Sequence, residues 1–473
     1  MSASSLSHHQ FAALICTFTA PAIRKLALPA ILLAATAPAS AFCGFYVGKA
    51  DASLFNEASK VVMVRDGDRT TINMLNDFQG DLKEFALVVP VPEVLKKEQV
   101  RTPHKVLFDR LDAYSAPRLA EYFDPDPCVP RLADRRMQMA PAAAPAGKSM
   151  APEDSAKRLG VTIEAQYTVG AYDIVILGAK ESDGLETWLT QSGYRIPPGA
   201  SKALAPYIRQ GMKFFVAKVN LEEQAKTGSN FLSPLAFSFK GEKFMLPIRL
   251  GMVNAKGPQD LVVWMLTPKG RVETTNYRTV KLPANMDIPA YIKTDTKQDF
   301  AAFYKTMFQT QAAREQYRVV FTEYFWDMSW CDPCAANPLS AQELRNLGVE
   351  WVKGDGGGNA ARPFRGDGNA RPVLVTRLHL RYTPETFPEE LMFQETGDRQ
   401  NYQTRYVLRH AVKVAPDACP QAPAYLAQVA QRKEKEAQML ASLTGWDITQ
   451  VRQSYGITAR QADSWQRLFN IAP

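Results

Sequence analysis

Three apolar runs separated by turn residues limit how the first part of the chain can fold. Residues 60–65 (KVVMVR) are rich in valine, and residues 66–68 (DGD) favour a turn because glycine takes positive φ without a Cβ clash. Residues 70–75 alternate polar and apolar side chains, which predicts a returning strand. Residues 85–91 form a third run in which Pro90, lacking an amide donor, should lie at a strand end or edge. Together they predict an antiparallel sheet with one buried face.

A targeting segment precedes these runs. Arg24 and Lys25 stand before an apolar stretch that ends in Ala39-Ser40-Ala41, a small-x-small cleavage pattern. This pattern predicts a signal peptide over residues 1–41, a mature chain starting near Phe42, and export to the periplasm or the medium. Residues 1–23 form an extra prefix, which an internal start codon or a long n-region explains equally well.

Cleavage there leaves an odd number of cysteines. The mature set is Cys43, Cys128, Cys331, Cys334 and Cys419. Disulfides persist in exported proteins, and an odd count leaves one thiol over. We expect Cys43 to bond Cys128, because both flank the N-terminal part, and connectivity among the other three stays open.

Several short motifs resemble a known family. They are residues 43–47 (CGFYV), 55–59 (FNEAS), 76–80 (NDFQG), 85–92 (FALVVPVP), 124–128 (DPDPC), 331–334 (CDPC) and 393–396 (FQET). The chain from about Cys43 to Cys419 resembles bacterial exported proteins of undetermined function, domain-of-unknown-function family 2330. The resemblance implies no catalytic residues, because none is established for that family.

Composition and periodicity divide the chain into five parts. They are the signal peptide (1–41), an N-terminal β-rich module (42–130), a disordered Ala/Pro-rich linker (131–158), an α+β domain (159–420) and a helical C-terminal tail (421–473). The predicted fold class is β-rich α+β, with antiparallel sheets, short packed helices and that helical tail.

Individual elements follow from the same patterns. Helices are predicted over residues 106–122 (interrupted at Pro117), 183–191, 202–210, 299–311, 424–443 and 446–469, with a further short helix opened by a capping box from Ser340 to Glu343. Strands are predicted over residues 161–168, 172–177, 212–219, 261–266, 318–326, 373–382 and 403–412, and a hairpin around Gly241 joins residues 236–239 to 243–250.

The sequence Trp330-Cys331-Asp332-Pro333-Cys334 is similar to the redox motif of thioredoxin-like proteins. Pro338 follows too closely for a long redox helix, and residues 354–369 are Gly-rich instead of βαβ. We therefore prefer a structural disulfide role for Cys331 and Cys334, with their partners left open. A thiol-disulfide oxidoreductase is the first alternative, and a zinc site would need two more ligands.

Two histidines raise a further alternative. His379 and His410 lie within predicted strands, and neighbouring strands would bring them together near Cys334 or Glu395 as a hydrolase or metal site. Structural histidines are the commoner explanation. Likewise, Asp124 and Asp126 fit a stiff turn before a disulfide better than a calcium site, which needs more oxygen ligands.

Net charge and the absence of known motifs limit the functions that the chain could have. Lys and Arg number 56 and Asp and Glu 48, a formal charge of +8, which fits weak attraction to anionic surfaces or, as we prefer, simple solubility. The sequence has no basic cluster interleaved with aromatics, so we expect no nucleic-acid binding. After the signal peptide it has no apolar stretch long enough to predict a transmembrane anchor. No G-x-S-x-G, H-E-x-x-H or Walker motif is present, and we expect no cofactor. The prediction is an exported binding or structural protein stabilised by disulfides, with no enzyme activity favoured.

Overall fold

The computed structural model describes most of the chain after residue 44. The described ranges are residues 45–49, 55–79, 85–129, 161–179, 182–197, 199–226, 232–255, 257–292, 298–329, 336–352 and 372–457. The predicted signal peptide, the predicted linker, the Gly-rich residues 354–369, and Cys43, Cys331 and Cys334 lie outside these ranges.

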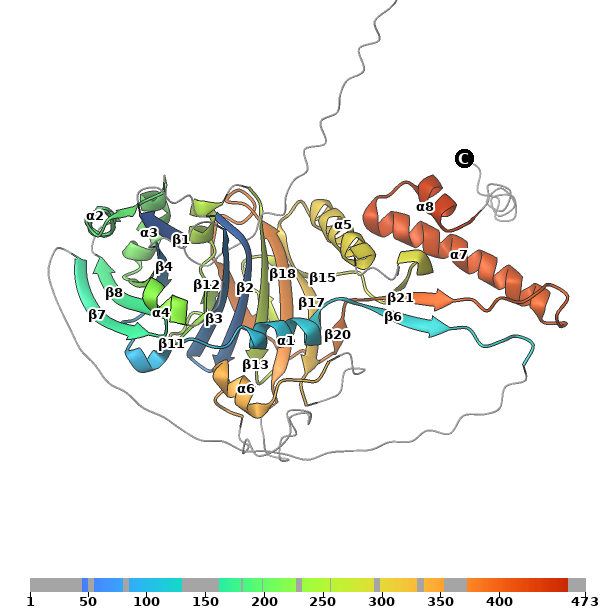
Figure 1. Cartoon of the computed structure of the whole chain (residues 1–473), viewed down its shortest axis with the longest axis horizontal. Helices are drawn as coiled ribbons and strands as arrows, with labels where there is room; N and C mark the ends of the chain where they lie inside the picture. The colour runs from blue at the N-terminus through green and yellow to red at the C-terminus, as the bar shows by residue number, and fades with distance from the viewer. Residues whose placement is uncertain are drawn as a thin grey trace, which may run out of the picture. The chain divides into compact units, whose positions relative to one another are not determined.

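Two large sheets organise the described chain (Figure 1). The six-stranded sheet has the order β7 (Val161–Val169), β8 (Tyr172–Ala179), β10 (Lys213–Val219), β4 (Phe85–Val91), β1 (Phe45–Lys49) and β9 (Tyr194–Arg195). The other sheet runs β15 (Arg278–Lys281), β17 (Val319–Asp327), β18 (Leu374–Tyr382), β13 (Gln259–Thr267), β2 (Phe55–Asp66), β3 (Arg69–Gln79), β11 (Leu235–Lys240) and β5 (Val100–Arg101), with β20 (Tyr402–Gln403) also pairing with β17. Most pairs are antiparallel; β2–β13 and β15–β17 are parallel. The β-rich α+β prediction is confirmed.

The two sheets pack face to face, and β2 shows how the sequence specifies this. Val61 and Met63 enter a core shared with Leu87 of β4, while Val62 and Val64 face a second core on the other side of the sheet. All four side chains are at most 2% exposed. The expected sheet with one buried face is therefore wrong, because a continuous apolar run indicates a strand buried on both faces.

The third apolar run was also placed in the wrong sheet. β4 pairs with β1 and β10 in the six-stranded sheet, not with β2 and β3. Pro90 lies beyond the last β4 residue that β1 pairs, Val88, and therefore near a strand end as predicted. Strands from residues 42–130 and from 159–420 are hydrogen-bonded in the same sheets. The domain boundaries themselves stay a prediction.

Helices cover the outer faces. α1 (Val106–Ser115) and α6 (Ala341–Asn346) pack on the nine-stranded sheet, and α2 (Ser182–Gln191) and α3 (Ala200–Arg209) on the six-stranded sheet. The Ser340–Glu343 capping box opens α6 as predicted. A short helix α4 (Leu221–Lys226) and the 3-10 turns η1 (Lys97–Gln99), η2 (Arg249–Asn254) and η3 (Ala290–Ile292) complete the connections.

Two local predictions have different outcomes. The helix predicted over residues 106–122, interrupted at Pro117, is short: it ends at Ser115, because Pro117 cannot donate, and β6 (Arg118–Phe123) follows as a strand. The expected hairpin around Gly241 does not form. β11 pairs with β3, whereas β12 (Met245–Leu246) joins β19 (Leu391–Glu395) and β14 (Val272–Thr274).

A third assembly is built around the C-terminal helices. β6 and β16 (Met286–Asp287) flank β21 (Arg405–His410) in a parallel sheet. α5 (Gln298–Arg314), α7 (Ala422–Thr444) and α8 (Ile448–Ser454) share a core with β17 and β21, which includes Phe303, Tyr406 and Leu440. The described part of the chain contains no helix long and apolar enough to cross a membrane.

Candidate functional site

A β-bulge in the nine-stranded sheet sets up a densely connected polar cluster around Glu323, the Glu323 cluster. Thr322 is opposite Leu378 and Tyr324 is opposite Arg377, so Glu323 is the extra residue on β17. A bulge changes the direction in which a side chain points, compared with the direction it would have in a regularly pleated strand. The bulge at Glu323 accounts for a fully buried carboxylate in a strand whose other residues are mostly apolar.

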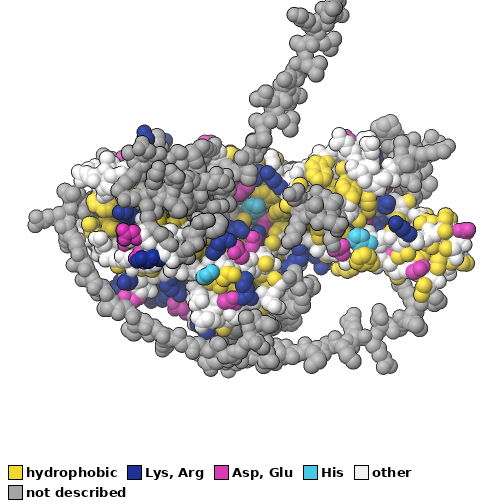
Figure 2. Space-filling model, in the orientation of Figure 1, with side chains coloured by type: hydrophobic (Ala, Val, Ile, Leu, Met, Phe, Trp, Pro, Cys, Tyr) yellow, Lys and Arg dark blue, Asp and Glu magenta, His cyan; other side chains and the backbone are white. Residues whose placement is uncertain are grey.

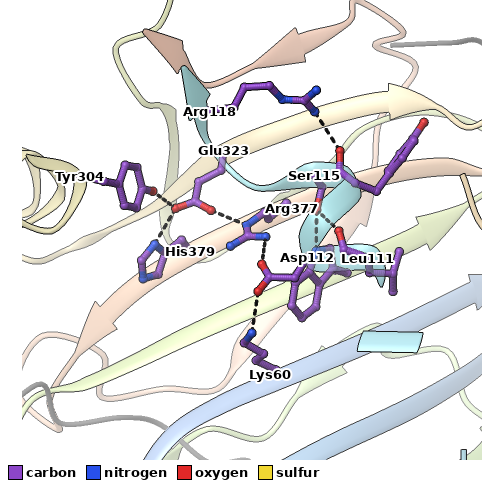
Figure 3. A network of polar contacts seen from close by, with 11 residues as sticks. Lys60, Leu111, Asp112, Ser115, Arg118, Tyr304, Glu323, Arg377 and His379 are labelled. Carbon is purple, nitrogen blue, oxygen red and sulfur yellow. Dashed lines mark hydrogen bonds and ion pairs between the residues drawn. The ribbon is translucent and has the colours of Figure 1, made fainter. Parts of the chain in front are cut away.

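The Glu323 carboxylate is held by three side chains (Figure 3). Oε2 accepts from Nε of Arg377 at 2.5 Å, and Oε1 lies 2.6 Å from Nδ1 of His379. Tyr304, from α5, donates its hydroxyl to the same oxygen as His379 approaches. Arg377 and His379 are two residues apart on β18, so both project from the same face of the strand. The ring of Phe308 stacks on His379 with a centroid separation of 3.7 Å.

The cluster continues from Arg377 to α1. Nη1 of Arg377 donates to Oδ1 of Asp112, and Nζ of Lys60 donates to Oδ2 at 2.6 Å. The guanidinium of Arg377 also lies over the buried Trp264 ring, 5.1 Å from its centroid. Trp264 in turn donates to Ser115 of α1 at 2.8 Å. The sheet, α1 and α5 are thereby joined through one network of ion pairs and hydrogen bonds.

The charges stabilise one another despite their burial. Burial by itself would raise the pKa of Glu323, but His379 and Arg377 outweigh it and hold the pKa well below its usual range. Burial likewise opposes ionisation of Asp112, yet Arg377 and Lys60 lower its pKa. The pKa of Tyr304 is raised, first by burial and then by the adjacent Glu323 charge. Glu323 is therefore an ionised acceptor with partners on both oxygens, which suits a structural brace.

The geometry around His379 does not favour nucleophilic catalysis. Its Nδ1 is engaged by Glu323, which would orient the imidazole of a general base. Among the described residues, however, no Ser, Thr or Cys side chain is hydrogen-bonded to His379. A hydrolase site would need a nucleophile within that reach.

The structure separates the two histidines that the sequence paired. β18 belongs to the nine-stranded sheet, and β21 belongs to the sheet with β6 and β16. His410 instead lies 3.0 Å from Glu121 and stacks on Phe123 of β6. On the face shown in Figure 2, histidine side chains lie in separate places. The described residues contain no group of three or more His, Cys, Asp or Glu side chains able to hold a metal.

One disulfide is formed within the described chain, and it corrects the expected pairing. Cys128 bonds Cys419 across 291 residues, so a Cys43–Cys128 bridge is wrong and Cys419 is not available to Cys331 or Cys334. Just before the bridge, Asp126 accepts from the Cys128 amide at 2.8 Å. Asp124 binds Arg432 and the hydroxyl of Tyr425. These contacts match the stiff turn that was preferred over a calcium site.

A pocket of about 640 Å³ lies between the end of β21 and the C-terminal helices. We call it the α7 pocket. Its lining is Ala290, Arg409, His410, Ala411, Val412, Lys413, Val414, Ala415, Leu426, Val429, Arg432, Lys433 and Tyr455. On α7, Leu426, Val429 and Arg432 are spaced three residues apart and Lys433 follows Val429 by four, as expected for one helix face. The lining thus combines small apolar side chains with four Lys or Arg residues and a histidine, and none of the described lining residues carries a carboxylate. Figure 2 shows basic side chains among apolar ones over α7 and β21.

The cations of this pocket are not equally neutralised. Arg409 pairs with Asp287 at 3.2 Å, and Arg432 pairs with Asp124 at 2.7 Å. Lys433 lies over the Tyr455 ring, 4.8 Å from its centroid, and neither Lys433 nor Lys413 has a carboxylate partner in the described ranges. These two lysines leave the pocket with an excess of positive charge.

Sequence reasoning missed two buried acidic residues. Glu323 interrupts the apolar run VVFTEYFW, and Glu436 lies on the buried face of α7, next to the pocket-lining residue Arg432. Acidic side chains are almost never fully buried unless they are paired. A charge inside a predicted core strand was therefore a readable signal for a buried partner, although it did not identify Arg377.

Comparison with known proteins assigns the chain to a family but gives it no biochemical activity. A family model described as an uncharacterized protein conserved in bacteria, DUF2330, matches residues 37–394. No curated protein and no solved structure matches the chain. The matched range includes every member of the Glu323 cluster. Apart from Ala290, the lining of the α7 pocket lies beyond it.

Proposed function

For this chain, which belongs to the DUF2330 family of uncharacterized proteins conserved in bacteria, we propose the function of an exported, disulfide-stabilised protein that binds an organic anion in the α7 pocket. The observation that carries this proposal is the lining of the pocket. Among the described residues, Lys413 and Lys433 have no carboxylate partners, so they supply positive charge beside an apolar wall that includes Val412, Leu426 and Val429. A ligand with an anionic group and an apolar body matches both parts.

Export is supported by two independent features. The chain carries the Arg24-Lys25 and Ala39-Ser40-Ala41 pattern of a signal peptide. Cys128 and Cys419 are bonded, and such bonds persist in oxidising compartments. Sequencing the N-terminus of protein recovered from the periplasm or medium should give a start near Phe42. An intact Met1 on protein found in the cytoplasm would contradict export.

Binding is tested with a matched pair of probes on the full mature chain. 2-Naphthalenesulfonate carries a permanent negative charge on an apolar ring system, and 2-naphthalenesulfonamide has the same shape without the charge. Isothermal titration calorimetry should show the sulfonate binding about fivefold more tightly, since one well-placed charge contact contributes about 1 kcal/mol. Equal affinity for both probes, or no heat from either, would contradict the proposal.

The position of the site is tested by removing a lysine that lines the pocket and, separately, a lysine of the same helix that does not. Lys433→Ala should weaken sulfonate binding about fivefold to tenfold, and adding Lys413→Ala should weaken it further. Lys435→Ala is the matched control, because Lys435 is exposed on α7 but does not line the pocket. Equal losses in Lys433→Ala and Lys435→Ala would indicate nonspecific attraction to net charge instead of a defined site.

A further inference from the structure

A buried carboxyl group lies directly behind the wall of the α7 pocket. Glu436 is only 1% exposed, and its Oε2 accepts a hydrogen bond from the hydroxyl of Tyr455. Nε of Arg432 lies 3.5 Å from Oε1, an ionic contact, but no described group donates a hydrogen bond to that oxygen. Tyr455 and Arg432 both line the pocket. Only the side chain of Tyr455 or Arg432 therefore separates Glu436 from a ligand in the pocket.

The surroundings of Glu436 leave its charge poorly compensated. Arg432 on α7, Arg409 on β21 and Asp287 on β16 act on it electrostatically, and Arg432 and Arg409 are each already paired with an aspartate. Tyr455 donates to it, and Tyr291 of η3 packs edge-on against Tyr455. Burial is the largest influence, and it raises the pKa of Glu436 to about 7. Near neutral pH the group can therefore exchange a proton at little cost.

We propose that the α7 pocket takes up its anionic ligand together with one proton, which is held on the carboxylate of Glu436. This inference rests on the anion-binding function proposed above. An anion beside Arg432 and Lys433 would be repelled by the Glu436 carboxylate and would compete with it for Arg432. Protonation removes both effects. The proton comes from solvent and the carboxylate becomes a neutral carboxyl group, with no other bond made or broken. By linkage, low pH tightens anion binding and the anion favours protonation.

The primary test uses the full mature chain and 2-naphthalenesulfonate, which stays ionised throughout the pH range. Calorimetric Kd values should rise as the pH increases from about 6 to about 8, by at most about tenfold per pH unit for one coupled proton. Titrations in buffers with different ionisation enthalpies should show net proton uptake, up to about one per ligand. A Kd independent of pH, with no proton uptake, would overturn the inference but leave the binding function intact. No binding at any pH would instead remove the proposed function itself.

Substitutions show which residue holds the proton that is taken up on binding. Glu436→Gln, a mimic of the protonated form, should bind tightly and flatten the pH dependence. Tyr455→Phe removes a donor to the carboxylate, so the midpoint should move to higher pH, and this variant serves if Glu436→Gln does not fold. His410 also lines the pocket and can carry a charge, so His410→Asn is the control and should keep the pH dependence. Loss of the dependence in His410→Asn alone would place the proton on His410 and refute the inference.

Discussion

Nε of Arg377 lies 2.5 Å from Oε2 of Glu323 inside the nine-stranded sheet, where the Glu323 side chain is wholly buried. Because desolvation of two charges is compensated only while both are present, removing one leaves the other unpaired. Glu323→Gln should therefore lower the free energy of unfolding by about 3–5 kcal/mol, measured by urea denaturation near neutral pH.

The control for this prediction is an exposed pair of the same chemistry. Glu350 lies 2.8 Å from Arg69, and the two side chains are 52% and 41% exposed. Glu350→Gln should cost less than about 1 kcal/mol, because solvent screens surface pairs. Comparable losses in the two variants would mean that the Glu323 cluster is not the brace described above.

The Cys128–Cys419 bond should stabilise the C-terminal assembly, since it closes a loop of 291 residues. Cys128→Ser is expected to cost about 2–5 kcal/mol, a usual loss for a native bridge. Cys419→Ser should cost the same, and the double variant little more, because both remove one bond. Non-reducing peptide mapping should recover the two cysteines in one linked pair. Recovery of Cys128 linked to Cys43 would contradict this structure.

Glu436 should destabilise the fold at alkaline pH. Its pKa is raised from 4.5 to about 7 by burial, so folding takes up a proton between these values. The stability contributed by this group therefore falls as the pH rises through that window, and the cost is complete above about pH 7. Glu436→Gln should gain about 1–3 kcal/mol over the natural chain at about pH 8 and almost nothing at about pH 4. Urea denaturation at both pH values measures this, and an equal gain at both would argue against titration of Glu436.

Local chemistry made several elements predictable. The Ser340–Glu343 capping box, the turn at Gly67 and the apolar β2 run each act over a few residues, and each appears as expected. Pro117 was also recognised as an interruption, although only the structure shows that the chain beyond it becomes β6. These features are readable because their cause and effect lie close together in the sequence.

Long-range relationships were not predictable in the same way. Whether β4 pairs with β2 or with β10 depends on residues more than a hundred positions away. The Cys128–Cys419 pairing spans 291 residues, and several pairings satisfy the same cysteine count. The Glu323–Arg377 contact requires a bulge at one position of β17, which the apolar pattern does not encode. A charge inside a predicted core strand indicates that a buried partner is needed, but only the fold identifies Arg377 as that partner.

The remaining cysteines lead to the last prediction, which separates a structural bridge from redox chemistry. Cys331 and Cys334 lie outside the described residues, but the Cys128–Cys419 bond leaves only Cys43 as their competitor in the mature chain. Two cysteines separated by two residues meet most readily, so we expect them to bond each other.

A structural bridge should have a potential below about −300 mV, whereas catalytic pairs lie at about −270 to −120 mV. Glutathione titration with alkylation of the mature chain measures the potential. A value in the catalytic range, together with insulin-reducing turnover lost in Cys331→Ser, would establish a thiol-disulfide oxidoreductase instead. If Cys43 were found bonded to either residue, the pair could not act as a dithiol, and the structural interpretation would hold with a different connectivity.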